Sequence, residues 1–104
     1  MLTAPADLAI FEANAALVAG FLRALANERR LMILCKLVEW REATPGRLAE
    51  AVGLSQSALS QHLAKMREEG IVAFRRESQT LWYRIADPRT ESLLGHLQRL
   101  YCST

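Results

Sequence analysis

Residues 44–70, TPGRLAEAVGLSQSALSQHLAKMREEG, decide how this chain folds. A Thr-Pro pair opens the stretch, and it is a favourable N-cap followed by a residue suited to the first helical position. Gly53 ends this first short helix, because glycine readily takes the positive φ of a helix C-terminus. Ser55 caps a second helix, which we place over about residues 55–69. Two short helices joined by a glycine-containing turn predict a helix-turn-helix.

The second helix has two unlike faces. Leu59, Leu63 and Met66 follow the spacing i, i+4, i+7 and share an apolar face. Elsewhere small hydroxyl and amide side chains dominate, where the solvated face of an ordinary helix would favour Glu and Lys. In the major groove, Gln can bond adenine in a bidentate way and Ser can bond several bases. The sequence therefore predicts duplex DNA as the ligand. The expected DNA contacts from this helix are Gln56, Ser57, Ser60, Gln61, His62 and Lys65. Of these, His62 is expected to pack beside the helix or to bond a phosphate.

A β-hairpin is expected directly after this helix, over about residues 71–86. The segments IVAFRR and LWYRIA carry β-branched and aromatic residues and flank a polar turn, ESQT. A hairpin in this position is a wing. Arg75 and Arg76 would reach phosphates, unless they only solubilise a strand end, and Gln79 at the tip would reach a minor groove. Phosphate contacts set register and base contacts set sequence.

Further helices complete the expected fold. One runs over about residues 7–24, one follows Asn27, and a last one runs over about residues 88–102. The chain is then a single domain, residues 1–104, mainly α with a small hairpin in the order α-α-α-α-β-β-α. Because the first and last helices carry apolar stripes and the core is small, both helices are candidates for a homodimer interface.

Composition excludes several classes of protein. The net charge of +2 is mildly basic, unlike that of a protein that coats nucleic acid through charge alone. No Ser-His-Asp set, glycine-rich phosphate loop or paired carboxylates can be assembled, so we expect neither an enzyme nor a cofactor. No signal peptide is visible, and the apolar-rich stretch over residues 13–22 is too short to span a bilayer. We therefore expect a cytoplasmic protein without a membrane partner.

Three segments together resemble the ArsR/SmtB family of bacterial winged-helix repressors: ANERRLMILCKL, RLAEAVGLSQSALSQHLAKMREEGIV and LWYRI. Within them, the S-x-S-x-x-S-x-H-L spacing from Ser55 to Leu63, followed by a wing, is specific to that family. The resemblance covers the chain from about residue 15 to its end. It implies a homodimer through the first and last helices, palindromic operator DNA, and release of that DNA when an inducer binds.

The metal sites of that family are incomplete in this sequence. One such site places cysteines on the first helix of the helix-turn-helix, but residues 42–48, EATPGRL, contain none. Another uses acidic and histidine ligands on the last helix, where Asp87 and His96 stand without a second histidine. Zinc prefers about four ligands, so we expect no metal. A metal-responsive repressor with a non-standard site built from Cys35, Cys102 and His96 remains an alternative.

The two cysteines suggest another switch. By residue type alone they are either inert thiols or a redox pair. Cys35 lies in an apolar run, whereas Cys102 lies two residues from the C-terminus, where exposure is usual. Their placement resembles that in the persulfide-responsive BigR/SqrR subgroup of the family. The resemblance implies that reactive sulfur species bridge Cys35 and Cys102 and release the DNA. A repressor without a thiol inducer, and a winged-helix protein-binding module, remain the alternatives.

Overall fold

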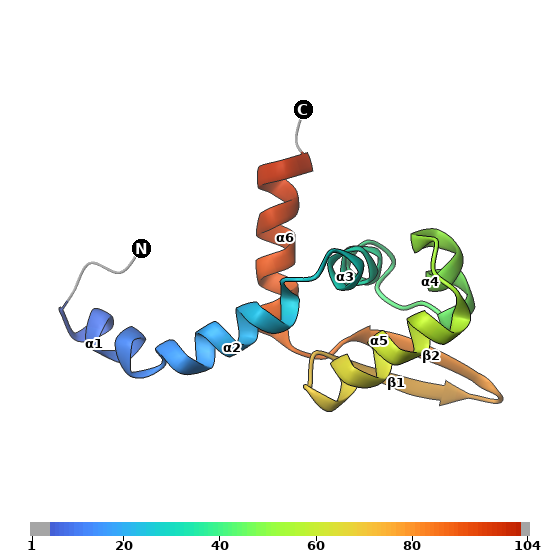
Figure 1. Cartoon of the computed structure of the whole chain (residues 1–104), viewed down its shortest axis with the longest axis horizontal. Coiled ribbons are helices and arrows are strands. Elements are labelled where there is room, and N and C mark those ends of the chain that lie inside the picture. The colour runs from blue at the N-terminus through green and yellow to red at the C-terminus, as the bar shows by residue number, and fades with distance from the viewer. Residues whose placement is uncertain (1–4, 103–104) are drawn as a thin grey trace.

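The structure, a computed structural model, describes the backbone of residues 5–102 and the side chains of residues 7–101. Helices make up most of it, and one antiparallel hairpin lies between the last two (Figure 1). This is the winged helix-turn-helix that the sequence predicts. Its elements are α1 (Pro5–Ala13), α2 (Ala15–Leu25), α3 (Glu28–Trp40), α4 (Pro45–Val52), α5 (Gln56–Glu68), β1 (Val72–Glu77), β2 (Thr80–Ile85) and α6 (Pro88–Cys102).

The helix termini form where the capping residues predict them. Asn27, Thr44 and Ser55 each accept a hydrogen bond from the backbone N–H three residues later, at 3.1, 3.3 and 3.1 Å. These side chains satisfy N–H groups that have no partner inside the helix. Gly53 ends α4 in the left-handed conformation with φ 70°. Local chemistry therefore sets the lengths of α4 and α5 and the turn between them.

The core lies where α3, α4, α5 and the base of the hairpin meet. The helix α3 packs against α4, β2 and α6, while α5 packs against α4 and β1. The apolar face predicted for α5 is buried here, since Leu59, Leu63 and Met66 are at most 1% exposed. Most of the remaining core comes from three other elements: Ile33, Leu34 and Leu37 of α3, Leu48, Ala49 and Val52 of α4, and Tyr83 of β2.

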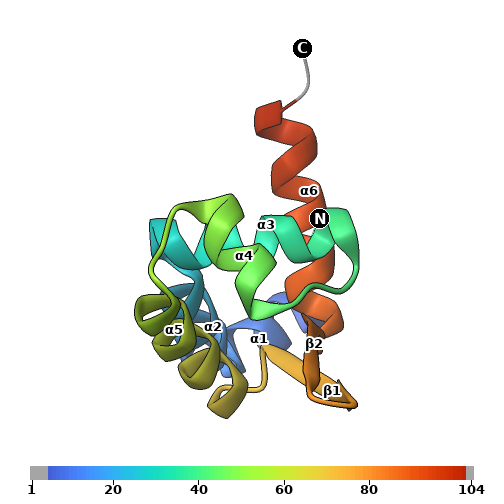
Figure 2. The same ribbon diagram turned by 90° about the vertical axis from the view of Figure 1, so that its right-hand side faces the viewer.

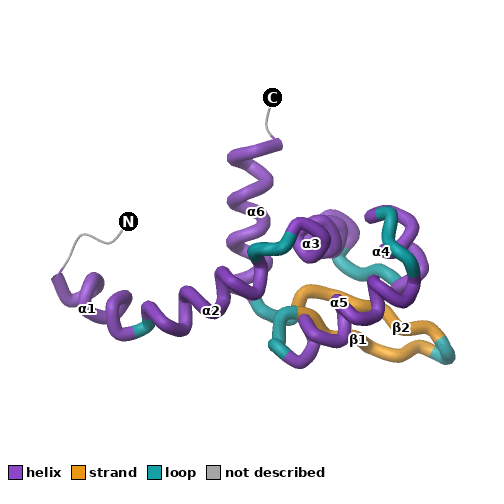
Figure 3. Tube along the Cα trace, viewed as in Figure 1, coloured by secondary structure: helices purple, strands orange, loops and turns teal. Residues whose placement is uncertain are grey.

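The single first helix predicted over residues 7–24 is wrong. The chain forms α1 and α2 instead, with a bend of 63° between them at Asn14, where Figure 3 shows a short loop. The side-chain Nδ2 of Asn14 donates a 3.0 Å hydrogen bond to the carbonyl of Ile10, which the Asn14 backbone N–H also approaches at 3.2 Å. Asparagine competes with the helix for backbone groups in this way. The apolar stripe continues through the break, so periodicity alone did not reveal it.

Within the described residues, no single helix is long and apolar enough to cross a membrane. Taken together, α1 and α2 have the length and composition, but they form a bent pair.

Two parts of the chain project from the core. The pair α1–α2 extends to one side as an arm (Figure 1), and α6 rises away from the body (Figures 1 and 2). The radius of gyration is accordingly 15.5 Å, against about 13 Å for a compact chain of this length. Both projections leave large apolar side chains exposed. These are Leu8, Ile10 and Phe11 of α1, Leu17 and Leu22 of α2, and Leu100 and Tyr101 of α6.

One buried arginine ties the arm to the core. The Nη1 atom of Arg30, at the start of α3, donates to the carbonyl of Ala24 at 2.8 Å and to the Oε1 atom of Glu69 at 3.0 Å. Arg30 is only 9% exposed. Ala24 belongs to the last turn of α2, and Glu69 caps the C-terminus of α5. Three helices are thus joined at one guanidinium group.

Replacing Glu69 tests this junction. In Glu69→Gln the charge-assisted bond becomes a neutral one, while Arg30 stays largely buried. Because Glu69 is itself about one-third exposed, we expect the free energy of unfolding to fall by only about 1 kcal/mol. Urea unfolding followed by circular dichroism measures it. The matched control is Glu68→Gln, which removes an exposed carboxylate that makes no ion pair among the described residues. Equal unfolding midpoints for both variants would contradict the role of the junction.

Candidate nucleic-acid interface

The helix α5 and the hairpin lie on the same side of the molecule. In Figures 1 and 2 both are at the bottom of the view, opposite the C-terminal end of α6. The α5 face that turns away from the core carries most of the side chains predicted to contact DNA. Exposed on it are Gln56, Ser57, Ser60, Gln61 and Lys65. The structure therefore brings these five together on one open surface beside the wing.

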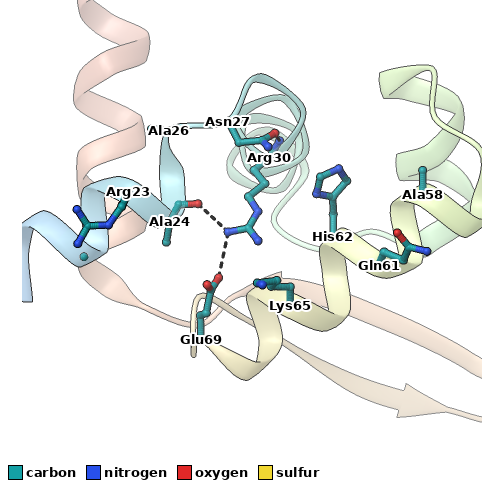
Figure 4. Close-up of a pocket in the computed structure, with 11 residues that line it drawn as sticks. Arg23, Ala24, Ala26, Asn27, Arg30, Ala58, Gln61, His62, Lys65 and Glu69 are labelled. Carbon is teal, nitrogen blue, oxygen red and sulfur yellow. Dashed lines mark hydrogen bonds and ion pairs between the residues drawn. The ribbon is translucent and has the colours of Figure 1, made fainter.

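His62 does not belong to this outward face. It is half-buried, and its ring points from α5 toward the start of α3, near Arg30 and Asn27 (Figure 4). The residue follows Gln61 by one position, which turns its side chain by about 100° around the helix axis. His62 therefore lines a cleft next to the α5 surface. The expectation that it packs beside the helix or bonds a DNA phosphate stays a prediction.

The wing is a regular antiparallel pair. Its register runs from Val72 opposite Ile85 to Glu77 opposite Thr80. This leaves a two-residue turn in which Ser78 has φ 60°. Two-residue hairpin turns commonly require such positive φ values because they match the strand twist. Gln79 follows in the same turn and lies at the exposed tip, where the sequence predicts it.

The base of the wing is attached to the rest of the chain by a backbone pair that the sequence analysis missed. Ala43, in the α3–α4 connection, donates to the carbonyl of Tyr83 at 3.1 Å and accepts from its N–H at 2.9 Å. Ala43 is fully buried. No residue pattern predicts such an isolated bridge, because only one residue of the connection takes part in it.

Arg75 is held by carboxylates. Its Nε and Nη2 atoms donate to the two carboxylate oxygens of Glu42 at 2.9 and 3.1 Å, and Nη1 donates to Glu77 at 3.3 Å. Its guanidinium also lies 5.6 Å from the ring centroid of Trp82. Arg75 therefore fastens the wing to the α3–α4 connection. Arg76, in contrast, is exposed and makes no ion pair among the described side chains.

The ion pair between Glu42 and Arg75 also shifts their titration. The hydrogen bond from Arg75 is the main reason why the pKa of Glu42 lies below its ordinary value of 4.5. The same hydrogen bond raises the pKa of Arg75. Both shifts favour the charged forms that hold the wing in place.

Two more arginines lie against aromatic rings near this surface. Arg47 of α4 lies 3.7 Å from the ring centroid of Trp40, and Arg67 of α5 lies 4.9 Å from that of Phe74. Stacking of this kind holds a guanidinium in place while it keeps its charge. Neither pair is visible in the sequence, because each joins two different elements.

Cys35 lies on α3 and is half-buried. It lines an apolar groove of about 490 Å³, together with Leu31, Met32 and Val52. The backbone of Cys102 ends α6, but its side chain lies outside the described residues. Among the described side chains, no group of three or more His, Cys, Asp or Glu could hold a metal ion. The structure therefore describes one of the two predicted thiols.

Comparisons with known proteins agree on one family. Residues 27–73 match the family model described as bacterial regulatory protein, arsR family. The transcriptional activator HlyU of Vibrio cholerae is 46% identical over 99 residues, which cover 95% of this chain and 91% of HlyU. A structure of reduced HlyU from that organism has a TM-score of 0.83 at 45% identity, covering 89% of this chain and 97% of HlyU. The repressor BigR of Xylella fastidiosa also has a TM-score of 0.83, at 34% identity, covering 98% of this chain and all of BigR.

Titration of Glu42 tests the attachment of the wing. Because its pKa is lowered on folding, the stabilisation is fully present above the ordinary value of 4.5 and is lost as pH falls through the lower, folded value. NMR titration of the side-chain carboxyl should give a midpoint below 4.5 in the wild type. In Arg75→Gln the midpoint should rise toward the ordinary value. A midpoint that is the same in both proteins would rule out the pair in solution.

Proposed function

Since the chain belongs to the ArsR family of bacterial regulatory proteins, we propose that it is an operator-binding homodimeric repressor with a thiol switch. Reactive sulfur species would bridge Cys35 and Cys102 and release the DNA. One observation carries the DNA-binding part: the exposed Ser and Gln face of α5 lies on the same side as the wing. A regulator of this kind would act in the cytoplasm.

In this proposal α5 enters the major groove. Ser57, Ser60 and Gln61 are short enough to bring the helix backbone close to the bases, and they can donate and accept hydrogen bonds at base edges. The wing then lies against the flanking backbone. Because Arg75 is engaged by Glu42, we assign Arg75 to holding the wing and Arg76 to contacting phosphate.

The homodimer is supported by the exposed apolar residues of the projecting elements. Phe11 on α1, Leu17 on α2 and Tyr101 on α6 are 48%, 61% and 82% exposed. Their burial against a second copy of the chain would be favourable, at about 25 cal/mol for each Å² removed from water. A two-fold axis through these helices also presents two copies of α5. A palindromic operator requires the two to lie about 34 Å apart.

The thiol switch is supported by the position of Cys35 and by the packing of its helix. Cys35 lines an apolar groove, from which an oxidant would approach its side chain. The helix α3 also packs against α6, which ends at Cys102. Among the relatives, HlyU of Vibrio cholerae has a structure in its reduced form.

The chemistry of the switch balances with an organic persulfide as the oxidant. A cysteine thiolate attacks the outer sulfur of RSSH, which forms a protein persulfide and releases RSH. The second cysteine then attacks the inner sulfur of that persulfide, so the disulfide forms and H₂S leaves. The cross-link would fix the end of α6 to α3. Since α3 is joined to α5 through Arg30, the bridged and reduced dimers would differ in the placement of α5 and hence in DNA affinity.

The first experiment tests whether α5 contacts the bases of an operator. Duplexes selected from a random pool should yield a palindromic sequence that binds two chains, as measured by light scattering of the complex. Ser57→Ala removes one base contact, so we expect operator affinity to fall about fivefold and affinity for an unrelated duplex to stay the same. The matched control is Ser92→Ala, an exposed serine on α6. No selected sequence, or equal losses on both duplexes, would refute reading by α5.

The switch is tested with an organic persulfide. Treatment of the reduced protein should lower operator affinity at least about tenfold, a coupling of about 1.4 kcal/mol. Mass spectrometry should find a tryptic peptide containing Cys35 linked to one containing Cys102. The Cys102→Ser variant should bind the operator and fail to respond. A full response by that variant, or undiminished affinity of the treated wild type, would exclude the dithiol switch and favour a repressor with another inducer.

A further inference from the structure

A cleft of about 590 Å³ lies between the α2–α3 junction and α5 (Figure 4). It is continuous with the DNA-facing surface, because Gln61 and Lys65 belong to both. Its other wall comes from the end of the arm and the beginning of α3. The polar side chains that line it are Arg23, Asn27, Arg30, Gln61, His62 and Lys65, with Glu69 at one end.

The cleft concentrates positive charge. Three cations, Arg23, Arg30 and Lys65, line it together with a single carboxylate, Glu69. With His62 neutral, the lining carries a formal charge of +2, as much as the whole chain of 104 residues. Positive charge gathered in a concave site attracts anions more strongly than the same charge spread over a surface.

The lining also has hydrogen-bond donors to spare. Arg30 makes both of its side-chain hydrogen bonds through Nη1, so Nε and Nη2 have no partner among the described residues. The side chain of Arg30 is only 11% exposed, and its position is held by those two bonds. Arg23 and Lys65 are exposed and make no ion pair within the described part of the chain. Such a set can donate several charge-assisted hydrogen bonds to one phosphate group.

We propose that this cleft binds a backbone phosphate of the DNA whose major groove α5 occupies. The inference rests on the proposed DNA binding and adds a contact site to it. A duplex that presents its bases to the outward face of α5 carries a phosphate strand along each side of that groove. The cleft borders α5 on the side of the arm, where it can receive one of these strands. Arg23, which lies on α2, then becomes a DNA-contacting residue.

This phosphate site would connect the dimer to the DNA. The helix α2 carries Arg23 near its end and the exposed Leu17 and Leu22 along its length. A rotation of one protomer against the other moves α2, and with it one wall of the cleft. Because phosphates carry no sequence information, the site raises affinity for every duplex and fixes the register of α5.

The test compares Arg23→Gln with Arg99→Gln. Arg99 is also exposed, and it lies in the last turn of α6, away from α5. Affinity for the operator and for an unrelated duplex is measured across a range of salt concentrations. Each phosphate contact adds about −0.9 to the slope of log affinity against log salt concentration. One contact therefore raises affinity about eightfold when the salt falls from about 1 M to about 0.1 M. Arg23→Gln should lose this share of the salt slope and of the affinity on both duplexes. Arg23→Lys should retain most of both, and Arg99→Gln should match the wild type.

Three outcomes would overturn the inference. If Arg23→Gln keeps the wild-type slope and affinity, DNA phosphate does not occupy the cleft. If inorganic phosphate shifts the His62 ring resonances in the wild type but not in Arg23→Gln, while the DNA slopes of the two are equal, the cleft binds free anions only. If the wild type binds no duplex, the proposed function fails together with the inference. Intact wild-type binding with an unchanged slope for Arg23→Gln refutes the inference alone.

Discussion

The pair of hydrogen bonds donated by Arg30 is the interaction on which the arrangement of the helices depends. One nitrogen atom, Nη1, joins the last turn of α2, through the carbonyl of Ala24, to the C-terminus of α5, through Glu69. A cation that is largely buried must keep such partners, because losing one leaves an uncompensated charge. The position of α5 relative to the arm is therefore coupled to a single side chain. This contact therefore joins the end of the arm directly to α5.

Other contacts hold the wing on the same side of the molecule as α5. Its base is hydrogen-bonded to Ala43, and Arg75 clamps β1 to Glu42 in the same connection. Both attachments come from the segment between α3 and α4, whereas α5 is held by the core and by Arg30. These attachments to the core, together with the direct packing of α5 against β1, place α5 and the wing side by side. This accounts for one continuous face built from elements with different local structure.

Much of the fold was predictable from local patterns. Asn27 and Ser55 begin helices, Gly53 ends one, and the alternating segments after residue 70 form strands, as predicted. The break at Asn14 was missed because its side chain competes with the helix while the apolar stripe continues. At the candidate interface, exposure of the Ser and Gln face of α5 followed from helical periodicity. The capture of Arg75 by Glu42 did not, since the two residues are 33 positions apart.

The sequence by itself determined the caps of α3, α4 and α5, the buried and exposed faces of α5, a polar turn in the wing and, from three segments spread along the chain, the family. The structural features among these depend on neighbours within a few positions, where capping and periodicity operate. The sequence placed Glu77 and Thr80 in that turn, but the structure pairs them as the last residues of the two strands. Only the tertiary structure decided which charged side chains form ion pairs among the described residues. Arg30 meets Glu69 across 39 positions, and Arg23 of α2 and Lys65 of α5 line one cleft. Such pairings depend on how the chain folds back on itself, and no local pattern encodes them.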